Sequence, residues 1–404
     1  MVHSADLELL GQLDMGEPAK PTLADAPGDT ARARHPTGIL PAQTIRALIR
    51  DKHIQSIHEI GEDQIQPASI DLRLGATAYR MRASFLPGAD VKVADRVEAL
   101  GMHEIDLSAG AVLEKGCVYI VPLMESVALG KRVSGMANPK SSSGRLDVFT
   151  RLIADGAIEF DRLRPAYKGP LFAEISPRAF SIVVRQGTSL NQLRLRRGNP
   201  PASDTAMRRL HGEIPLVDAP PGDENIAQGI AVTVDIAGAG ADALIGYKAR
   251  PHASLIDVDK VAHYEAAEFW EPLHAGRHGA LILNPGDFYI LASKESVTVP
   301  PDHAAEMRAY DILVGEFRVH YAGFFDPGFG YDDSGGKGSR AVLEVRSHEV
   351  PFVLEDGQVV GRLVYERLTE VPDKIYGTAI GSSYQRQSLA LAKQFKQPAY
   401  TKDQ

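Results

Sequence analysis

The sequence predicts a mainly β protein built from two tandem domains with few short helices. Short apolar runs rich in β-branched and aromatic residues, such as 118–121 and 180–184, alternate with Gly, Pro and Asp, a pattern typical of strands joined by turns. Helical spacing of apolar residues occurs over 42–49 and then becomes rare until 388–396, which predicts a short helix or an ordered tail. The remaining observation is an internal repeat.

Identical residues recur at a single offset of 170 positions. The pairs are Gly116 and Gly286, Tyr119 and Tyr289, Glu125 and Glu295, Ser126 and Ser296, Val127 and Val297, Glu174 and Glu344, Gly187 and Gly357, and Leu193 and Leu363. A shared offset over about eighty residues predicts duplication and fusion of one β-barrel or sandwich domain. Two unrelated β domains with chance matches remain the alternative.

Composition sets the expected boundaries. Residues 1–36 show weak periodicity and predict a flexible arm, followed by a first domain over 37–196. The polar, Pro- and Gly-rich stretch 197–228 predicts a linker, 229–390 a second domain and 391–404 a tail. Residues 237–278 match the repeat poorly, so their role stays open, and Phe269 and Trp270 fit either a core or an interface.

Charge and cysteine content exclude several classes of protein. The net charge of −8 over 404 residues provides no global basic field, so we expect no nucleic-acid partner. Cys117 is the single cysteine, which excludes an intrachain disulfide and a thiolate-rich zinc site. The sequence has neither an apolar run of membrane-spanning length nor a signal-peptide core, so we expect a cytoplasmic protein without membrane contact.

Five segments, in order, resemble motifs of the dCTP deaminase family in the dUTPase-like superfamily. They are 64–75, with its Gln-Pro-Ala-Ser-Ile-Asp signature; 140–145, with Lys140 in place of a first Arg; 322–330; 342–344; and 384–388, preceded by Ser383 where relatives often carry Lys. The resemblance implies a double-length, duplicated form of the family, with two dUTPase-like distorted β-barrels of jelly-roll type. It implies conversion of dCTP to dUTP and ammonia.

The motifs are divided between the two repeats. The first repeat carries the Ser/Arg motif, and its hairpin is predicted to be degenerate, with 154–156 separated from Phe160 and Asp161. The second repeat has the intact hairpin, but 310–315 lack the hydroxyls and the arginine. Because family sites form between subunits of a trimer, the resemblance implies a homo-oligomer with trimer-like barrel packing. It also implies a composite site, in which one repeat supplies the Ser/Arg motif and the other the hairpin and a glutamate.

Glu344, Arg145 and Ser141 are the candidate catalytic residues. Glu344 would take a proton from water and return it to the base, with its pKa raised by burial. Arg145 would stabilise developing negative charge, and Ser141 would orient the water or bind phosphate. Glu174 is the alternative catalytic glutamate, and an ordinary strand residue or salt-bridge partner is the alternative role for Glu344.

The resemblance also implies a set of substrate contacts. Asp326 would bond the sugar 3′-hydroxyl. The expected substrate-binding residues are Lys140, Ser142, Ser143, Ala322, Asp326, Val342, Leu343, Tyr376, Tyr384 and Gln387. The H-x-E…P-C-x-x-C signature of zinc deaminases is absent, so we expect no protein-bound zinc and only the Mg²⁺ that the triphosphate carries.

Two other functions remain open at this point. One is hydrolysis of dUTP to dUMP and pyrophosphate, alone or coupled to deamination. The other is a non-catalytic deoxynucleotide-binding protein that has kept the fold. The expected ligands are dCTP and dUTP. Whether dTTP inhibits, as it does in relatives, stays open.

Overall fold

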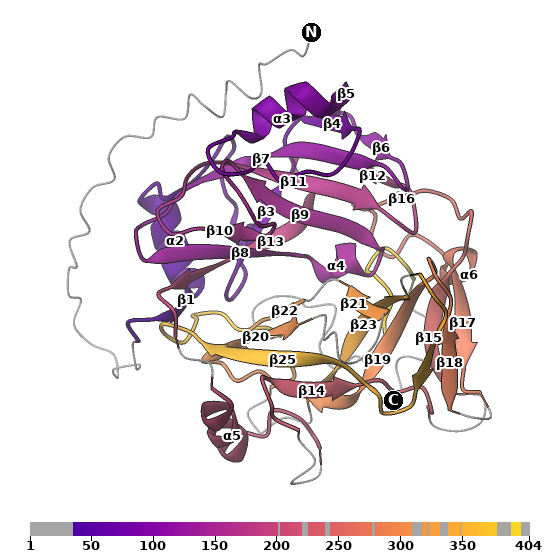
Figure 1. Cartoon of the computed structure of the whole chain (residues 1–404). Coiled ribbons are helices and arrows are strands. Elements are labelled where there is room, and N and C mark those ends of the chain that lie inside the picture. The colour runs from indigo at the N-terminus through magenta and orange to yellow at the C-terminus, as the bar shows by residue number, and fades with distance from the viewer. Residues whose placement is uncertain are drawn as a thin grey trace.

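The computed structural model describes residues 35–200, 203–219, 225–238, 243–276, 279–308, 323–331, 338–347, 349–377 and 389–396, and the backbone alone of 317–320. Residues 1–34 of the predicted arm lie outside these ranges. Strands dominate and the helices are short (Figure 1). The prediction of a mainly β fold is therefore confirmed.

The first half contains two larger sheets and one small one. Its strands are β1 (Gly38–Ile39), β2 (Ile54–Ser56), β3 (Ile70–Arg73), β4 (Thr77–Met81), β5 (Gly101–Asp106), β6 (Ala111–Leu113), β7 (Val118–Ala128), β8 (Val133–Pro139), β9 (Val148–Ala154), β10 (Arg162–Leu163), β11 (Lys168–Pro177), β12 (Ile182–Val184) and β13 (Ser189–Arg197). One sheet runs β5-β4-β7-β11-β9. In another, β13 pairs with β3 and β8, and β8 pairs with β10, while β6 pairs with β12.

The second half repeats this arrangement. Its strands are β14 (Ile230–Thr233), β15 (Leu244–Ala249), β16 (Ile256–Asp257), β17 (Trp270–His274), β18 (Ala280–Leu283), β19 (Phe288–Val297), β20 (His303–Arg308), β21 (Phe317–His320), β22 (Phe324–Phe325), β23 (Ser339–Ser347), β24 (Phe352–Glu355) and β25 (Val359–Arg367). The sheet orders are β17-β15-β19-β23-β21 and β14-β25-β20-β22, and β18 pairs with β24. Each sheet of the first half therefore has a counterpart in the second.

The residues that recur at the 170-residue offset hold equivalent turns and bonds. The hydroxyls of Tyr119 and Tyr289 accept backbone N–H bonds five residues upstream, at 2.9 and 3.0 Å. The carboxylates of Glu125 and Glu295 accept the N–H at the end of β3 and of β14, at 2.7 and 2.8 Å. Most of the repeat visible in the sequence is therefore structural, because it fixes strand ends.

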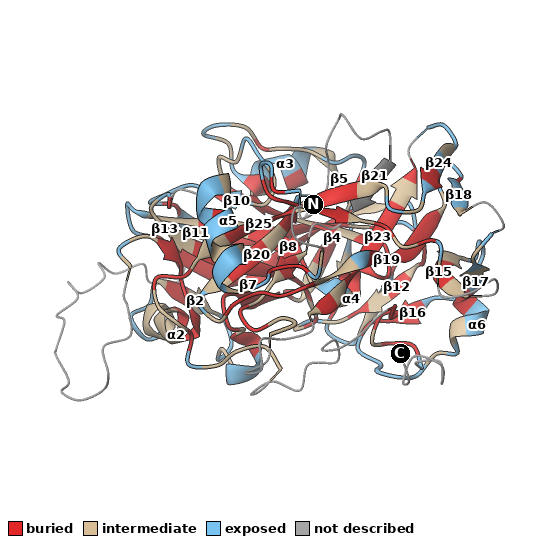
Figure 2. Ribbon diagram, turned by 90° about the horizontal axis from the view of Figure 1, so that it is seen from below, coloured by how far each residue is buried: buried red, intermediate tan, exposed pale blue. Residues whose placement is uncertain are grey.

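Five α-helices and one 3₁₀ turn lie within the described ranges. They are α2 (Ala42–Arg50), η1 (Glu62–Gln64), α3 (Val93–Leu100), α4 (Ser141–Gly144), α5 (Asp204–Glu213) and α6 (Ala266–Phe269). The helical prediction for 42–49 is matched by α2. Helix α3 was not predicted, and α5 interrupts the stretch expected to be a linker, where Ser203 caps the helix by accepting the N–H of Ala206. Both α3 and α5 expose one face at the surface (Figure 2).

The core is not divided cleanly between the two halves. One cluster of buried side chains fills the first barrel and continues into residues from 247 to 292 and from 389 to 395, while a second cluster fills the other barrel. Phe269 and Trp270 are buried in the first cluster, where the ring of Phe180 meets them edge-on at 5.7 and 5.4 Å. The region left open by the sequence thus joins the halves.

The segment 389–396 is ordered but contains no helix. Leu391 and Ala392 are fully buried, and the ring of Phe395 lies 5.9 Å from that of Trp270. Of the two interpretations of the sequence, the ordered tail is therefore the correct one.

Strands β13 and β25 bring the halves together. Arg196 of β13 pairs with Glu366 of β25 at 3.4 Å, and these two residues are themselves related by the 170-residue offset. Ile39 forms a β-bridge with Leu368 beside this contact, and β12 pairs with β16 in parallel orientation. The halves therefore pack around an approximate twofold axis that runs between Arg196 and Glu366.

Candidate active site

Glu344 projects from the second half towards the first. In β23, Leu343 and Val345 are fully buried in the core of the second barrel. Because successive side chains of a strand point to opposite faces, Glu344 faces away from its own barrel. Val342, on the same side as Glu344, packs against the core cluster of the first half. A carboxyl group is thus placed at the contact between the halves.

Burial changes the protonation of this group. Glu344 is only 6% exposed, and desolvation raises its pKa to about 8, while the nearby charge of Arg145 and its own backbone N–H oppose the rise. A carboxyl with a pKa close to neutral can both take up and release a proton under physiological conditions. The charge of Arg145 in the first half therefore acts on the carboxyl of the second half.

Arg145 is positioned by the turn that follows α4. This turn also presents Asp147, which is fully buried and forms an ion pair with Arg346, two residues after Glu344 on the same face of β23. Arg145 itself is 7% exposed, and its Nη1 donates to the carbonyl of Ala390 at 3.1 Å. The turn is therefore joined to β23 through Asp147 and to the C-terminal segment through Arg145.

The hairpin of the second half reaches the first half through Arg194. The guanidinium of Arg194 donates to the carbonyl of Ala305 at 3.1 Å and to the Asp326 carboxylate at 3.2 Å, and it lies 3.9 Å from the centre of the Phe324 ring. Arg194 is 3% exposed. Desolvation raises the pKa of Asp326, and the charge of Arg194 opposes that rise.

A mixed charge cluster lies on the same side as Asp326. Asp71 forms an ion pair with Lys140, the residue before α4. Desolvation raises the pKa of Asp71 despite Lys140 and Lys393, and the charge of Asp71 in turn acts on Asp326. Desolvation and the charge of Lys140 lower the pKa of Lys393. Lys140 is thus paired with Asp71, on which the charge of Lys393 also acts.

The other predicted contacts fall into four groups. Ser141 is exposed and Ser143 buried, with Ser142 between them in exposure, all in α4. The backbone N–H of Tyr376 donates to the carbonyl of Pro327 at 2.8 Å, so this residue does lie at the hairpin. Ala322, Tyr384 and Gln387 lie outside the described residues, as do 309–316. Leu343 points into the barrel core, so its side chain does not face the contact between the halves.

Glu174, the alternative catalytic residue, has a different environment. It lies at the equivalent place in β11, opposite Ile120, as Glu344 lies opposite Ile290. It is 1% exposed and forms an ion pair with Arg151 of β9, whose guanidinium lies 3.5 Å from the centre of the Phe160 ring. The charge of Glu174 is therefore paired with that of Arg151 on the neighbouring strand of the same half.

The degenerate hairpin of the first half was located wrongly from the sequence. In the structure, β10 pairs with β8 as β22 pairs with β20, with Arg162 opposite Met136 and Phe324 opposite Glu306. The counterpart of 324–329 is thus 162–167, which keeps a proline at 165 and has Arg164 where the second half has Asp326. The sequence prediction placed the hairpin at 154–156 because Asp and Gly occur there. The strand pairing, which identifies the true counterpart, cannot be read from residue types.

Comparison with known proteins bears on this geometry. Residues 36–199 match the model of the 2′-deoxycytidine 5′-triphosphate deaminase (DCD) N-terminal domain, and residues 203–395 match that of the DCD C-terminal domain. The crystal structure of 2′-deoxycytidine 5′-triphosphate deaminase from Agrobacterium tumefaciens is 55% identical, with a TM-score of 0.79, and the match covers 83% of this chain and all of that one. The chain belongs to the dCTP deaminase family.

Shorter matches link the chain to curated deaminases. A protein of Halobacterium salinarum named dCTP deaminase, dUMP-forming, is 37% identical over 110 residues, which is 26% of this chain and 52% of that protein. A protein of the same name from Pseudarthrobacter chlorophenolicus is 31% identical over 141 residues, 33% of this chain and 70% of that one. The chain thus spans about half the length of the first of these relatives.

Within this dCTP deaminase fold, sequence reasoning missed three charged residues. Asp71 lies inside the quoted Gln-Pro-Ala-Ser-Ile-Asp signature but was given no role. Arg194 interrupts the apolar run of β13 between two buried leucines, which is a signal that its strand face is covered by another part of the chain. Lys393 carried no recognisable signal, because its position depends on the path of the C-terminal segment.

Two absences apply to the described ranges only. No three His, Cys, Asp or Glu side chains there are grouped as metal ligands would be. No helix in that part of the chain has the length and apolar character needed to cross a bilayer.

Proposed function

We propose that this chain hydrolyses dCTP, as its Mg²⁺ complex, to dUTP and ammonia at a site shared by its two halves. The observation that carries the proposal is the buried carboxyl of Glu344, which faces the first half, has its pKa raised to about 8 and feels the charge of Arg145. Perturbed carboxyls next to a specific charge partner are typical of catalytic acids and bases. The reaction would belong to cytoplasmic deoxynucleotide metabolism.

The chemistry follows from a single carboxylate that carries protons. Ionised Glu344 takes a proton from water while the oxygen adds to C4 of the cytosine ring, and Glu344 passes that same proton to N3. The resulting tetrahedral carbon holds both the new hydroxyl and the amino group. Glu344 then passes the hydroxyl proton to the amino nitrogen, the C4–N bond breaks, and ammonia leaves as the C4 carbonyl forms. Arg145 stabilises the negative charge that builds up during water addition.

The remaining residues would hold the substrate. Lys140 and Lys393 provide positive charge for the phosphates, together with the hydroxyls of Ser141 and Ser142. Asp326, fixed by Arg194, would accept the bond from the sugar 3′-hydroxyl. The Mg²⁺ ion would arrive on the triphosphate, which keeps metal chemistry within the substrate.

A second product is favoured by one observation. The curated relatives that match part of this chain carry the name dCTP deaminase, dUMP-forming. We infer that a coupled reaction, in which dUTP is hydrolysed to dUMP and pyrophosphate before release, is the main alternative. This reaction needs a water molecule held beside the α-phosphate. Among the described carboxylates, Asp326 is our candidate to hold that water.

Product analysis separates these functions. Purified protein is incubated with dCTP and Mg²⁺, ammonia is measured in a coupled assay, and nucleotides are separated by anion exchange. We expect equal amounts of ammonia and dUTP. Ammonia with dUMP and pyrophosphate would instead establish the coupled reaction. Binding of dCTP without ammonia would contradict both and would leave a nucleotide-binding protein.

Assembly is a further part of the proposal. The halves of one chain resemble two subunits in their packing, and we propose that chains associate further with trimer-like barrel contacts. Sedimentation of the purified protein tests this, since a monomer at micromolar concentration would contradict it. Inhibition by dTTP would be measured in the same ammonia assay.

A further inference from the structure

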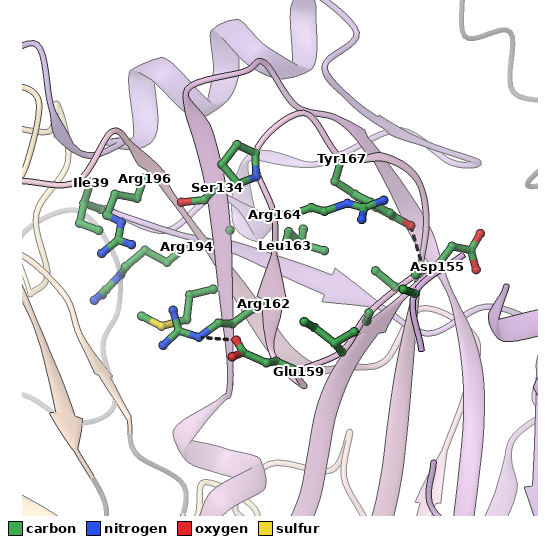
Figure 3. A pocket seen from close by; sticks show the side chains of 18 of the residues that line it. Ile39, Ser134, Asp155, Glu159, Arg162, Leu163, Arg164, Tyr167, Arg194 and Arg196 are labelled. Atoms are coloured by element: carbon green, nitrogen blue, oxygen red, sulfur yellow. Dashed lines mark hydrogen bonds and ion pairs between the residues drawn. The ribbon is translucent and has the colours of Figure 1, made fainter. Parts of the chain in front are cut away.

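A cavity of about 430 Å³ lies between the two halves, away from Glu344. It is bounded by β8, by the β9–β10 loop and the hairpin of the first half, and by β13, with Glu366 of β25 on the opposite side. Figure 3 shows Arg162, Arg164, Arg194 and Arg196 around it, with Leu163 and Tyr167 on the hairpin side. None of the residues proposed to act on dCTP lines this space.

The approximate twofold axis explains what the cavity is. On the other side of the axis, the side chain of Arg194 occupies the equivalent space, where it touches Ala305, Phe324 and Asp326. The strand pairings of β8 with β10 and of β20 with β22 give the counterparts of those three residues as Gly135, Arg162 and Arg164. All three counterparts line the cavity.

The counterpart of Arg194 in the second half is a smaller, uncharged residue. Arg194 pairs with Met136 across β13 and β8, and Val364 pairs with Glu306 across β25 and β20, at the same offset of 170. Leu363 and Tyr365 point into the core of the second barrel, so Val364 faces the first half as Arg194 faces the second. The second half therefore has a valine where the first half has Arg194. Val364 itself does not line the cavity, which the second half borders through Glu366.

The charges around the cavity are also changed. Arg164 stands where the second half has Asp326, and within the described residues its side chain makes no hydrogen bond or ion pair. Arg162 and Arg196 face acidic partners, Glu159 and Glu366, each at 3.4 Å. An exposed arginine without a carboxylate partner at the rim of a cavity favours an anionic ligand.

The floor of the cavity is apolar. Its lining includes Ile39, Met136, Leu163 and Tyr167, together with small residues of the β9–β10 loop. The volume lies within the roughly 300–1,000 Å³ of small-molecule sites, which combine apolar walls with a few placed polar groups. Apolar walls and a cationic rim together suit a ligand with a ring or aliphatic body and a single charged end.

We propose that this cavity is a second binding site, for a small organic anion with an aromatic or aliphatic body. The ligand would lay its body against Met136 and Leu163 and its charge against Arg164. Arg194 lines the cavity and also holds Asp326, so an occupant would be in direct contact with a residue that positions the hairpin of the candidate active site. The proposal does not depend on the chemistry at Glu344.

Direct binding tests the site without any measure of activity. The probe is 8-anilinonaphthalene-1-sulfonate, which combines an aromatic body with one negative charge, followed by fluorescence in the full chain. Two variants change the cavity: Arg164→Glu reverses the rim charge at an exposed position, and Ala157→Trp fills the loop side. Arg132→Glu makes the same charge change at an exposed arginine that does not line the cavity.

We expect Arg164→Glu to weaken probe binding by about tenfold or more, because it removes one charge-assisted contact. Ala157→Trp should weaken binding by about the same factor, because its ring occupies the space that the probe needs. Arg132→Glu should bind the probe as the unaltered chain does, and dUMP, a second organic anion, should displace the probe. Inorganic phosphate, which lacks an apolar body, should not displace it. Equal binding by all three variants, with unchanged melting temperatures, would overturn the proposal.

Discussion

Glu174 and Glu344 hold the same place in the two halves but have different partners. Both are buried on the strand next to the central one, and both face away from their own barrel core. Glu174 is paired with Arg151 on the neighbouring strand, whereas Glu344 faces the other half and has its pKa raised to about 8. Burial alone therefore does not make a carboxyl reactive. The two glutamates differ in their charged neighbours, which lie on the adjacent strand for Glu174 and in the opposite half for Glu344.

Replacing each glutamate by glutamine is the most direct test of whether Glu174 and Glu344 have different roles. We expect Glu344→Gln to lower kcat for ammonia release by about 10²–10⁴-fold, because an amide cannot carry the proton. Binding of dCTP, measured by calorimetry, should be largely kept.

Glu174→Gln is the matched control. It removes one member of a buried ion pair, so we expect a lower melting temperature from the uncompensated Arg151 but near-normal kcat for the folded protein. The opposite pattern, with turnover lost in Glu174→Gln and retained in Glu344→Gln, would show that the first half holds the catalytic carboxyl.

Arg145→Ala tests whether the contact between the halves takes part in chemistry. We expect kcat to fall on the order of 10²-fold if the guanidinium stabilises charge that develops as water adds to the ring. Steady-state kinetics with dCTP measures this. A rise in KM with unchanged kcat would show instead that Arg145 only binds the ground state.

The smallest expected effect is a pH dependence. If Glu344 acts as the base, kcat/KM should rise with pH and level off above about 8. The raised pKa also means that the contribution of Glu344 to stability is complete below about pH 4.5 and is lost as pH rises through about 8. As pH rises between these values, the melting temperature of Glu344→Gln should therefore increase relative to that of the unaltered chain. A difference in melting temperature that does not change with pH would contradict the assignment.

Much of the fold could be predicted because its determinants are local. Turn glycines and the Tyr119 and Glu125 bonds recur with identical letters, so the repeat was visible in the sequence. Helix α3 was missed because its eight residues bury only Val93 and Val97, too few to establish a helical period. The first hairpin was misplaced because strand register, not residue type, identifies it.

The candidate site was predictable only in part. Glu344 and Arg145 were found because each sits in a motif, and in the structure the charge of Arg145 acts on Glu344 across the halves. Arg194 and Lys393 were not found, since their positions depend on how β13 meets the second hairpin and where the C-terminal segment runs. Contacts between residues more than a hundred positions apart, such as Arg194 with Asp326, leave no periodic signal in the sequence.

The bond from Arg145 to the carbonyl of Ala390 has a consequence for the order of events during synthesis. The two residues are 245 positions apart, so a ribosome making about 5–20 residues per second needs roughly 12–50 seconds to synthesise the chain between them. Throughout that time the first barrel has no cover for the surface on which 389–395 later pack. A nascent chain therefore holds its Ser/Arg turn long before the turn has the carbonyl, the strand and the carboxyl that complete its surroundings.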